Sequence, residues 1–359
     1  GNWPTRWAPA TCRCRMRDPR RCRRPFPWLL VRRRDRLRSL DERGRSVSAR
    51  LNWEQDGRDW PHREASQFVE AGGLRWHVQR FARTASASGV PGPAPLALLL
   101  HGTGASSHSW HPMLPWLQPH FDLLLLDLPG HAYTSMPSAW QASLPGMAQS
   151  VRALLDALDA TPTIIIGHSA GAALGARMCL DGHASPQSLI SINGAFLPLG
   201  GLAGVLFPPA AKLMAALPFA PGMVARRAAD PRAIARLVSD TGSVLDEAGM
   251  ALYGRIVSNP GHIEGALAMM ANWDVQPLAR DLPRLQTPVA LIVADNDRAV
   301  PPAQAQRVLA LLPPQARTTL TRLSGAGHIV HEEQPAQVAA LCLSAMRAEA
   351  LPSRVVAAV

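Results

Sequence analysis

Short apolar runs at regular intervals dominate the pattern of hydrophobic and polar positions along this 359-residue chain. Two segments that alternate apolar and polar residues come first, SQFVE at 66–70 and LRWHVQR at 74–80, and the turn at 71–73 between them predicts a β-hairpin. Six continuous runs follow, and runs that are apolar on both faces are typical of strands buried in a parallel sheet. These runs are 96–100, 123–127, 163–167, 188–192, 289–294 and, more weakly, 318–323.

Helical periodicity fills most of the spaces between those runs. A chain in which buried strands alternate with helices favours an α/β fold, with a mostly parallel sheet and helices on both of its faces. The segments with this periodicity are 144–159, 170–181, 302–312 and 334–348.

One long interval, 194–275, interrupts the alternation. It contains no convincing strand and is rich in Ala, Leu, Met and Pro, so we interpret it as a helical cap inserted into the core. The core then has a first part, 51–193, and a second part, 276–350, and residues 351–359 form a tail.

Charge divides the chain at about residue 50. Residues 1–50 hold sixteen Arg and four acidic residues, whereas the other 309 residues hold twenty-one basic and twenty-two acidic residues. The basic segment has no periodicity, mixes Trp and Pro among its Arg and begins at Gly1, so we interpret it as a disordered or non-native leader. A basic arm that binds nucleic acid or an anionic membrane is the alternative, but we expect no nucleic-acid partner.

Signals for export or membrane insertion are weak. The apolar run PFPWLLV at 25–31 is short and is followed by three Arg, which argues against a signal peptide. Residues 184–211 are uncharged and long enough to span a bilayer, but their four Pro and four Gly would break a spanning helix. We therefore expect a soluble, cytoplasmic protein, and peripheral contact of the cap with a membrane stays open.

The five Cys residues favour neither disulfides nor a metal site. Cys12, Cys14 and Cys22 lie in the leader and lack a fourth ligand at zinc spacing. Cys179 and Cys342 fall on apolar helical faces, where a buried, unreactive thiol is the usual outcome. We expect no metal and no cofactor.

The strongest chemical signal is TIIIGHSAG at 163–171, a buried strand that leads through G-x-S-x-G into a helix of small residues. In this setting Ser169 would occupy a sharp strand-to-helix turn, and Gly167 and Gly171 would allow neighbouring backbone to approach closely. The helix N-terminus would favour negative charge developing at the site. We predict that Ser169 is a nucleophile; the alternative is a serine that only caps the helix.

A nucleophilic serine needs a base, and the base needs an orienting carboxylate. The loop after 289–294 supplies Asp297, with Asp295 as its rival, and the loop after 318–323 supplies His328. Strand ends on one edge of a parallel sheet converge on one crevice. We prefer Asp297 because it comes directly before the turn, and we expect Asp295 to cap or brace the loop. His331 is the rival base, but it begins a helical stretch with two Glu, so we expect it on the surface.

The loop HGTG at 101–104 closes the strand at 96–100. Its backbone could face a cavity, and an oxyanion hole would then use the N–H groups of Thr103 and Ala170; the alternative is a simple tight turn. A second loop of this kind, DLPGH, contains Asp127 and His131, which we interpret as structural bracing.

The interval 194–275 contains large apolar side chains and few charges, which suggests a bulky hydrophobic substrate. For any one of these side chains taken singly, however, packing between the cap's own helices is the preferred explanation. Three are the candidate substrate contacts, Trp273, Met270 and Phe196, and Met269, Phe207 and Met214 accompany them. Arg226, Arg227 and Arg255 could meet a substrate carboxylate, but we expect a solvated face.

With these motifs in order, residues 51–348 resemble the α/β-hydrolase superfamily, which implies an α/β-hydrolase fold with an inserted cap. A narrower resemblance, to the magnesium chelatase accessory family of bacteriochlorophyll biosynthesis, rests on the order and number of several segments. They are LNWEQDGRDWPHREAS at 51–66, GGLRWHVQR at 72–80, HGTGASSHSW at 101–110, GHSAGAALGARMCLDG at 167–182, INGAFLPLGGLAG at 192–204 and ALAMMANWD at 266–274.

That resemblance implies a place near magnesium insertion into protoporphyrin, with a tetrapyrrole as one candidate substrate and the chelatase subunits as candidate partners. Two hypotheses follow. The first is a serine hydrolase that cleaves an ester or similar carbonyl bond through Ser169, His328 and Asp297. The second is a non-catalytic porphyrin-binding accessory or carrier protein for the chelatase.

Overall fold

A computed structural model describes most of the chain after residue 49, and it separates Gly1–Leu37 from a second unit, Arg38–Val359. All that follows concerns the second unit. The residues described in it are 50–84, 94–198, 209–210 and 212–347, together with the short strands at 39–40, 46–47 and 354–358.

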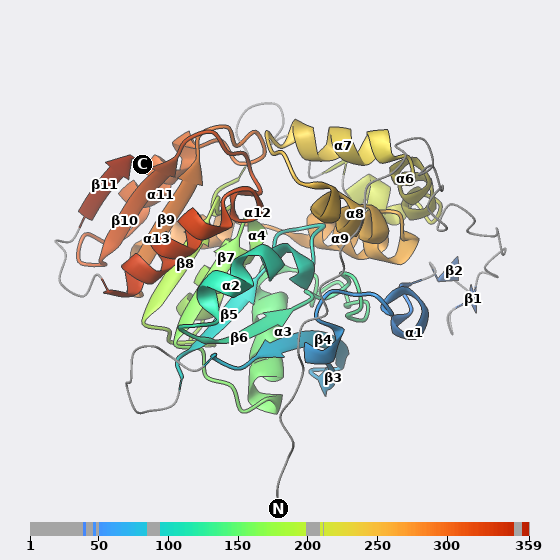
Figure 1. Cartoon of the computed structure of the whole chain (residues 1–359), viewed down its shortest axis with the longest axis horizontal. Coiled ribbons are helices and arrows are strands. Elements are labelled where there is room, and N and C mark those ends of the chain that lie inside the picture. The colour runs from blue at the N-terminus through green and yellow to red at the C-terminus, as the bar shows by residue number, and fades with distance from the viewer. Residues whose placement is uncertain are drawn as a thin grey trace, which may run out of the picture. The chain divides into compact units, whose positions relative to one another are not determined.

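The centre of the fold is a nine-stranded sheet in the order β11-β10-β9-β8-β7-β5-β6-β4-β3 (Figure 1). The hairpin β3–β4 and the β4–β6 pair are antiparallel, and all other neighbours are parallel. The strands are β3 (Ser66–Ala71), β4 (Leu74–Phe81), β5 (Leu96–Leu100), β6 (Asp122–Leu126), β7 (Ile164–His168), β8 (Ser188–Ile192), β9 (Val289–Ala294), β10 (Thr318–Leu323) and β11 (Arg354–Ala358). A separate two-stranded sheet pairs β1 (Ser39–Leu40) with β2 (Ser46–Val47).

This sheet confirms the predicted α/β class, the hairpin and the apolar strands. β11 was not predicted: the segment treated as a tail contains a strand that pairs in parallel with β10 along 318–322. Its sequence, RVVAA, carries little signal, because it is too short to show an alternation and the neighbouring strand is needed to define it.

Helices cover both faces of the sheet, because successive strand residues point to opposite sides. In β5, for example, Leu98 and Leu100 belong to one core cluster, and Ala97 and Leu99 belong to the other. The first face is covered by α3 (Leu144–Ala157), α4 (Ala170–Leu180), α10 (Gln276–Asp281) and α11 (Ala303–Leu311). The second is covered by η3 (Ser107–Met113), α2 (Leu114–Leu117), α12 (Val330–Glu333) and α13 (Pro335–Arg347).

Helices α6 (Ala220–Ala228), α7 (Pro231–Asp240), α8 (Glu247–Val257) and α9 (Pro260–Asn272) gather in the interval predicted to form a cap (Figure 1). The side chains of Asp230, Asp246 and Asn259 cap the first turns of α7, α8 and α9. The apolar faces of these helices, including Ile234 and Tyr253, form a third buried cluster. The described part of the interval is thus helical, without a strand.

Arg50, which the predicted boundary assigns to the leader, lies within the fold. Its guanidinium donates to the carbonyl oxygens of Gly261 and Ala132, both at 3.1 Å, and also to those of Gly130 and Thr134. Burial lowers the pKa of Arg50 to about 10. The folded core therefore begins no later than Arg50, one residue before the predicted boundary.

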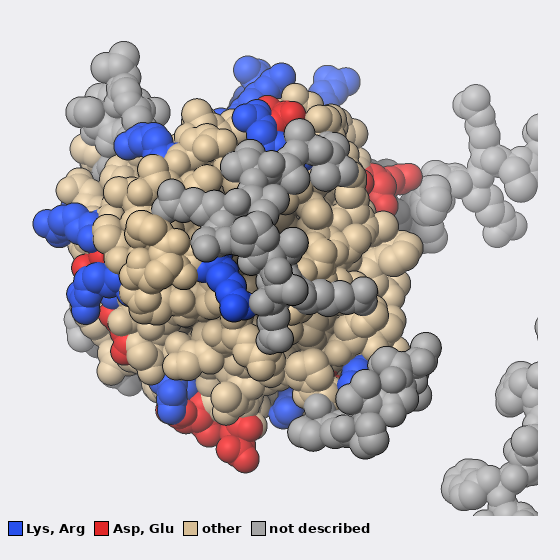
Figure 2. Space-filling view, turned by 90° about the vertical axis from the view of Figure 1, so that its left-hand side faces the viewer, with Lys and Arg blue, Asp and Glu red and all other residues tan. Residues whose placement is uncertain are grey.

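The surface of the second unit carries charges of both signs. On the side that lies to the left in Figure 1, Lys and Arg stand singly or in small groups, with Asp and Glu close to several of them (Figure 2). This mixture agrees with the near balance of basic and acidic residues after residue 50. Among the described helices, none is both long and apolar enough to cross a bilayer.

Candidate active site

Ser169 lies at a strained turn between β7 and α4. Its backbone has φ 53° and ψ −117°, a combination that is costly for a residue with a side chain. The flanking glycines allow the turn to form: a Cβ at Gly167 would lie 2.5 Å from the backbone of Ala172, and a Cβ at Gly171 would lie 2.0 Å from the carbonyl oxygen of Leu100. The turn therefore presents Ser169 at the carboxyl end of the sheet.

His328 and Asp297 form a buried pair at the same end. The Nδ1–H of His328 donates to Oδ2 of Asp297 at 2.8 Å. The second oxygen, Oδ1, accepts the backbone N–H groups of Ala299 and Val300, each at 2.8 Å. Since Asp297 is only 4 % exposed, three hydrogen bonds fix its carboxylate in the orientation that holds the imidazole.

Asp295 has a different set of partners. It receives the Nε–H and the Nη2–H of Arg322, at 2.8 and 2.7 Å, and the hydroxyl of Ser324 at 3.3 Å. These contacts brace the ends of β9 and β10, and none of them reaches His328. Of the two acids, the structure brings Asp297 to His328.

Among the described residues, no hydrogen bond joins Ser169 to His328. The ring of His168, the residue before Ser169, lies 4.6 Å from the ring of His328, measured between centroids. Within the described residues the Ser169 hydroxyl has no hydrogen-bond partner. Contacts between nucleophile and base are often long in an unliganded enzyme and shorten when substrate binds.

The prediction that His331 lies on the surface is wrong. His331 is fully buried, its Nε2–H donates to Ser109 Oγ at 2.8 Å, and its ring packs on Trp110 and His168. Burial lowers its pKa to about 3, so the ring is neutral. The neighbouring Glu332 and Glu333 suggested an exposed helix, but α12 packs this residue against η3.

The HGTG loop lies against the Ser169 turn. A Cβ at Gly102 would lie 2.9 Å from Nδ1 of His168 and 3.1 Å from Cβ of Ser169, so a side chain there would force the Ser169 turn to shift. Thr103 is exposed, and its hydroxyl donates to the sulfur of Met269 in α9 at 3.5 Å. Within the described part of the chain, the backbone N–H groups of Thr103 and Ala170 have no acceptor, so both could donate to an oxyanion.

Two residues that sequence reasoning missed hold the His328 loop. His168 Nε2–H donates to the carbonyl oxygen of His328 at 2.8 Å, and the Asn193 amide donates to the same oxygen at 2.9 Å. Asn193 Oδ1 also accepts the N–H of Ala294 at 2.8 Å, which joins the loops after β8, β9 and β10. The one available signal was position, since Asn193 directly follows a predicted strand and His168 is the variable residue before the serine.

The site therefore combines a serine on a strained turn, an oriented histidine and unpaired backbone donors. The sequence also matches the family described as alpha/beta hydrolase fold over residues 95–335. The chain belongs to the α/β-hydrolase family.

The comparisons with single proteins agree with this assignment. The chain is 39 % identical over 274 residues to the magnesium-chelatase 30 kDa subunit of Rhodobacter capsulatus, covering 76 % of this chain and 92 % of that protein. Among solved structures, it is similar to the epoxide hydrolase CorEH without ligand, with 20 % identity, a TM-score of 0.64 and coverage of 79 % of this chain and 98 % of the other. An α/β hydrolase fold protein from Burkholderia ambifaria has 20 % identity, a TM-score of 0.63 and coverage of 83 % and 99 %.

In this α/β-hydrolase, Asp127 braces the loops beside the site, as predicted for a structural residue. It accepts His77 Nδ1–H at 2.8 Å and the backbone N–H groups of Ser107 and Tyr133 at 2.8 and 3.2 Å. Burial would raise the pKa of Asp127, but the charge and hydrogen bond of His77 and the amide of Ser107 hold it well below its usual value. His131 is also buried, which lowers its pKa to about 3.

Several other histidines of this α/β-hydrolase-fold protein are buried, and burial lowers the pKa of each of them. The pKa falls to about 4 for His101 and to about 3 for His108 and His262, and it lies well below the usual value for His111 and His168. These rings are neutral. His101, His168 and His262 bond to backbone groups, as when the N–H of Leu128 donates to His101 Nε2 at 2.8 Å. His108 bonds to the hydroxyl of Ser106, and His111 donates to the side-chain carbonyl of Gln79.

The three candidate substrate contacts predicted from the sequence differ in their surroundings. Phe196 is 1 % exposed and belongs to the main core cluster, which favours a packing role. Trp273 and Met270 are partly buried at the edges of two clusters, and the Nε1–H of Trp273 has no partner among the described residues. Met269 is buried and Met214 is partly buried, whereas Phe207 lies outside the described residues.

The three arginines considered as partners for a substrate carboxylate lie in two different settings. Arg226 and Arg227 are exposed on α6, in agreement with a solvated face. Arg255 is bound by both oxygens of Asp59, at 2.8 Å each, beside Trp60. Among the described residues, no hydrogen bond or ion pair joins any of the three to His328 or Asp297.

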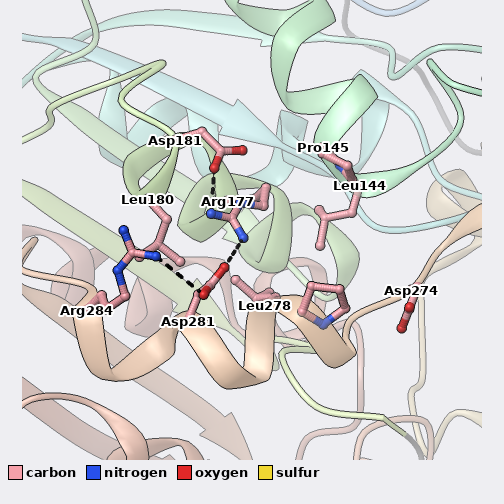
Figure 3. A pocket seen from close by; sticks show the side chains of 10 residues that line it. Leu144, Pro145, Arg177, Leu180, Asp181, Asp274, Leu278, Asp281 and Arg284 are labelled. Atoms are coloured by element: carbon pink, nitrogen blue, oxygen red, sulfur yellow. Dashed lines mark hydrogen bonds and ion pairs between the residues drawn. The ribbon is translucent and has the colours of Figure 1, made fainter.

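A pocket of about 310 Å³ lies between α3, α4 and α10, and its lining includes none of Ser169, His328 and Asp297 (Figure 3). Arg177 stands between Asp181 and Asp281, which it contacts at 2.5 and 2.7 Å, and Arg284 approaches Asp281 at 3.6 Å. The two arginines and two aspartates form ion pairs with one another, and these pairs link α10 to α4. Arg177 is eight residues after Ser169, or about 12 Å along the helix.

Proposed function

We propose that this α/β-hydrolase is a cytoplasmic serine hydrolase associated with magnesium chelatase and bacteriochlorophyll biosynthesis, acting on an ester or similar carbonyl bond of a hydrophobic substrate. The observation that carries the proposal is the buried His328–Asp297 hydrogen bond of 2.8 Å beside a serine on a strained turn. A carboxylate fixed by three hydrogen bonds can orient an imidazole, and the oriented imidazole can then act as the base that activates a hydroxyl group.

In this mechanism Ser169 Oγ attacks the carbonyl carbon while His328 Nε2 takes its proton. Asp297 keeps the proton of His328 on Nδ1 and stabilises the imidazolium that forms. The N–H groups of Thr103 and Ala170 receive the oxyanion, and the N-terminus of α4 adds a favourable dipole. His328 then protonates the leaving group, and a water molecule activated by the same histidine releases the acyl product.

The substrate class is proposed from two sources. Thr103 and Met269 connect the HGTG loop with cap helix α9, so apolar cap residues such as Met270 and Trp273 would cover an entering substrate. The relative from Rhodobacter capsulatus is named as a chelatase subunit. A tetrapyrrole ester fits both, and the chelatase subunits are the proposed partners.

A second candidate function is a porphyrin-binding accessory or carrier protein for the chelatase. The name of that relative favours it, because the name describes a subunit and not a hydrolase. In this case the cap would hold the pigment and Ser169 would be dispensable. Protoporphyrin binding by the Ser169→Ala protein, together with full support of pigment synthesis, would be the expected result.

The first experiment is labelling of the full chain with a fluorophosphonate probe, because removal of residues 1–50 would also remove the buried Arg50. We expect labelling of the wild-type protein and none of Ser169→Ala or His328→Ala. Ser107→Ala is the matched control, since this buried hydroxyl has no partner among the described residues. A folded wild-type protein that does not react would contradict the hydrolase and favour the carrier.

A further inference from the structure

The connection between α7 and α8, residues 241–244, crosses the loops that carry His328 and Asp297. The carbonyl oxygen of Thr241 accepts the backbone N–H of His328 at 3.3 Å and that of Arg298 at 3.1 Å. Ser243 Oγ accepts the N–H of Ile329 at 2.8 Å. A segment of the cap is therefore bonded to the residue after the acid, to the base and to the residue after the base.

Glycines bring these backbones into direct contact. Gly242 has φ 85°, and a Cβ there would lie 2.0 Å from the carbonyl oxygen of Asn296. A Cβ at Gly327, next to His328, would lie 2.2 Å from the carbonyl carbon of Gly242. Glu333 closes the contact, because its carboxylate accepts Gly327 N–H at 3.0 Å and Val244 N–H at 3.2 Å.

Cap helix α8 makes a second connection to the same loop. The Tyr253 hydroxyl, on a side chain that is 7 % exposed, donates to Glu332 Oε1 at 2.9 Å. Ser109 of η3 donates to the same oxygen and accepts a hydrogen bond from His331. Short helix α12 begins two residues after His328, so it is held by the cap on one side and by the core on the other.

We propose that residues 241–244 and Tyr253 form a cap clamp, which positions His328 opposite Asp297 and couples the placement of the base to the placement of the cap. The inference rests on the proposed function, since it assigns positioning residues to that site. Displacement of the base by about 1 Å can lower a rate by about a hundredfold, so a few hydrogen bonds at this place matter more for catalysis than for stability.

The test uses four variants of the full chain. Ser243→Ala and Tyr253→Phe each remove one hydroxyl of the clamp. Ser107→Ala and Tyr133→Phe are the matched controls, because each removes a buried hydroxyl without a partner in the described residues. The rate constant for modification of Ser169 by a fluorophosphonate is measured together with the melting temperature and the NMR resonance of the His328 Nδ1 proton.

We expect the two clamp variants to react about tenfold more slowly than the wild type, and the double variant more slowly still. The His328 Nδ1 resonance should shift or broaden in them, and both controls should behave as wild type. Rates within about twofold of wild type with an unchanged resonance would overturn the clamp. If the wild-type protein does not react at all, the proposed function fails, and the resonance alone still decides whether the cap positions His328.

Discussion

Asp297 and Asp295 are two residues apart, yet only one of them touches an imidazole. Asp297→Asn would leave His328 without a charged acceptor and could hold its ring in the wrong tautomer. We expect the rate of Ser169 modification to fall by about a hundredfold to ten-thousandfold. Asp295→Asn, which weakens a partly exposed ion pair with Arg322, should change the rate less than about threefold. Equal losses in both variants, measured by labelling kinetics, would argue against this assignment.

Glu332 gives a prediction for pH dependence at the scale of a residue. Burial raises its pKa from 4.5 to about 8, although Ser109 and Tyr253 donate to it; Asp246 and Glu333 raise it further. The folded protein therefore keeps a proton that the unfolded chain loses above pH 4.5, so this group makes stability fall as pH rises from 4.5 to 8. Glu332→Gln keeps a side-chain oxygen that can accept the hydrogen bonds of Ser109 and Tyr253, but it removes the group that gains and loses a proton.

The free energy of unfolding, measured in urea at several pH values, should fall less steeply for Glu332→Gln than for wild type across that window. The difference between the two proteins isolates this carboxyl group from the other titrating side chains. Parallel curves would show that Glu332 is ionised in the folded protein at neutral pH.

At the scale of elements, the contact of α4 with β5 depends on Gly171. Gly171→Ala would place a Cβ 2.0 Å from Leu100 O, so we expect a loss of at least about 3 kcal/mol or failure to fold. Gly222→Ala in α6 is the control, because nothing lies within 4 Å of its added Cβ. There a gain of up to about 1 kcal/mol follows from helix propensity. Chemical denaturation compares the two variants.

The elements also show how far the sequence could predict this structure. The strands at 163–167 and 289–294 were found because burial on both faces leaves a continuous apolar run. The turn at Ser169 was found because its strain demands glycines at fixed positions. The contacts of His331, Asn193 and residues 241–244 were missed, since they join segments far apart in the sequence and depend on backbone geometry that no local pattern records.

At the scale of the whole molecule, Arg50 connects the start of the packed chain to the loop at 130–134 and to the first turn of α9. Arg50→Ala would leave carbonyl oxygens of Gly130, Ala132 and Gly261 without this donor, so we expect a loss of about 2–4 kcal/mol. Arg58→Ala, at an exposed position with one backbone contact, should have little effect. Deleting residues 1–37 should leave the melting temperature unchanged, whereas deleting 1–50 should lower it.

The buried neutral histidines give the molecule a particular response to acid. Seven of its twelve histidines, His101, His108, His111, His131, His168, His262 and His331, have lowered pKa values in the fold. Each of them can bind a proton freely only when the chain unfolds, so the contribution of these histidines to stability is full above pH 6.5, the ordinary histidine value, and is lost as the pH falls below it. Because several histidines take up protons together on unfolding, the acid transition should span a narrow pH range. The rate of acid unfolding should therefore depend steeply on proton concentration.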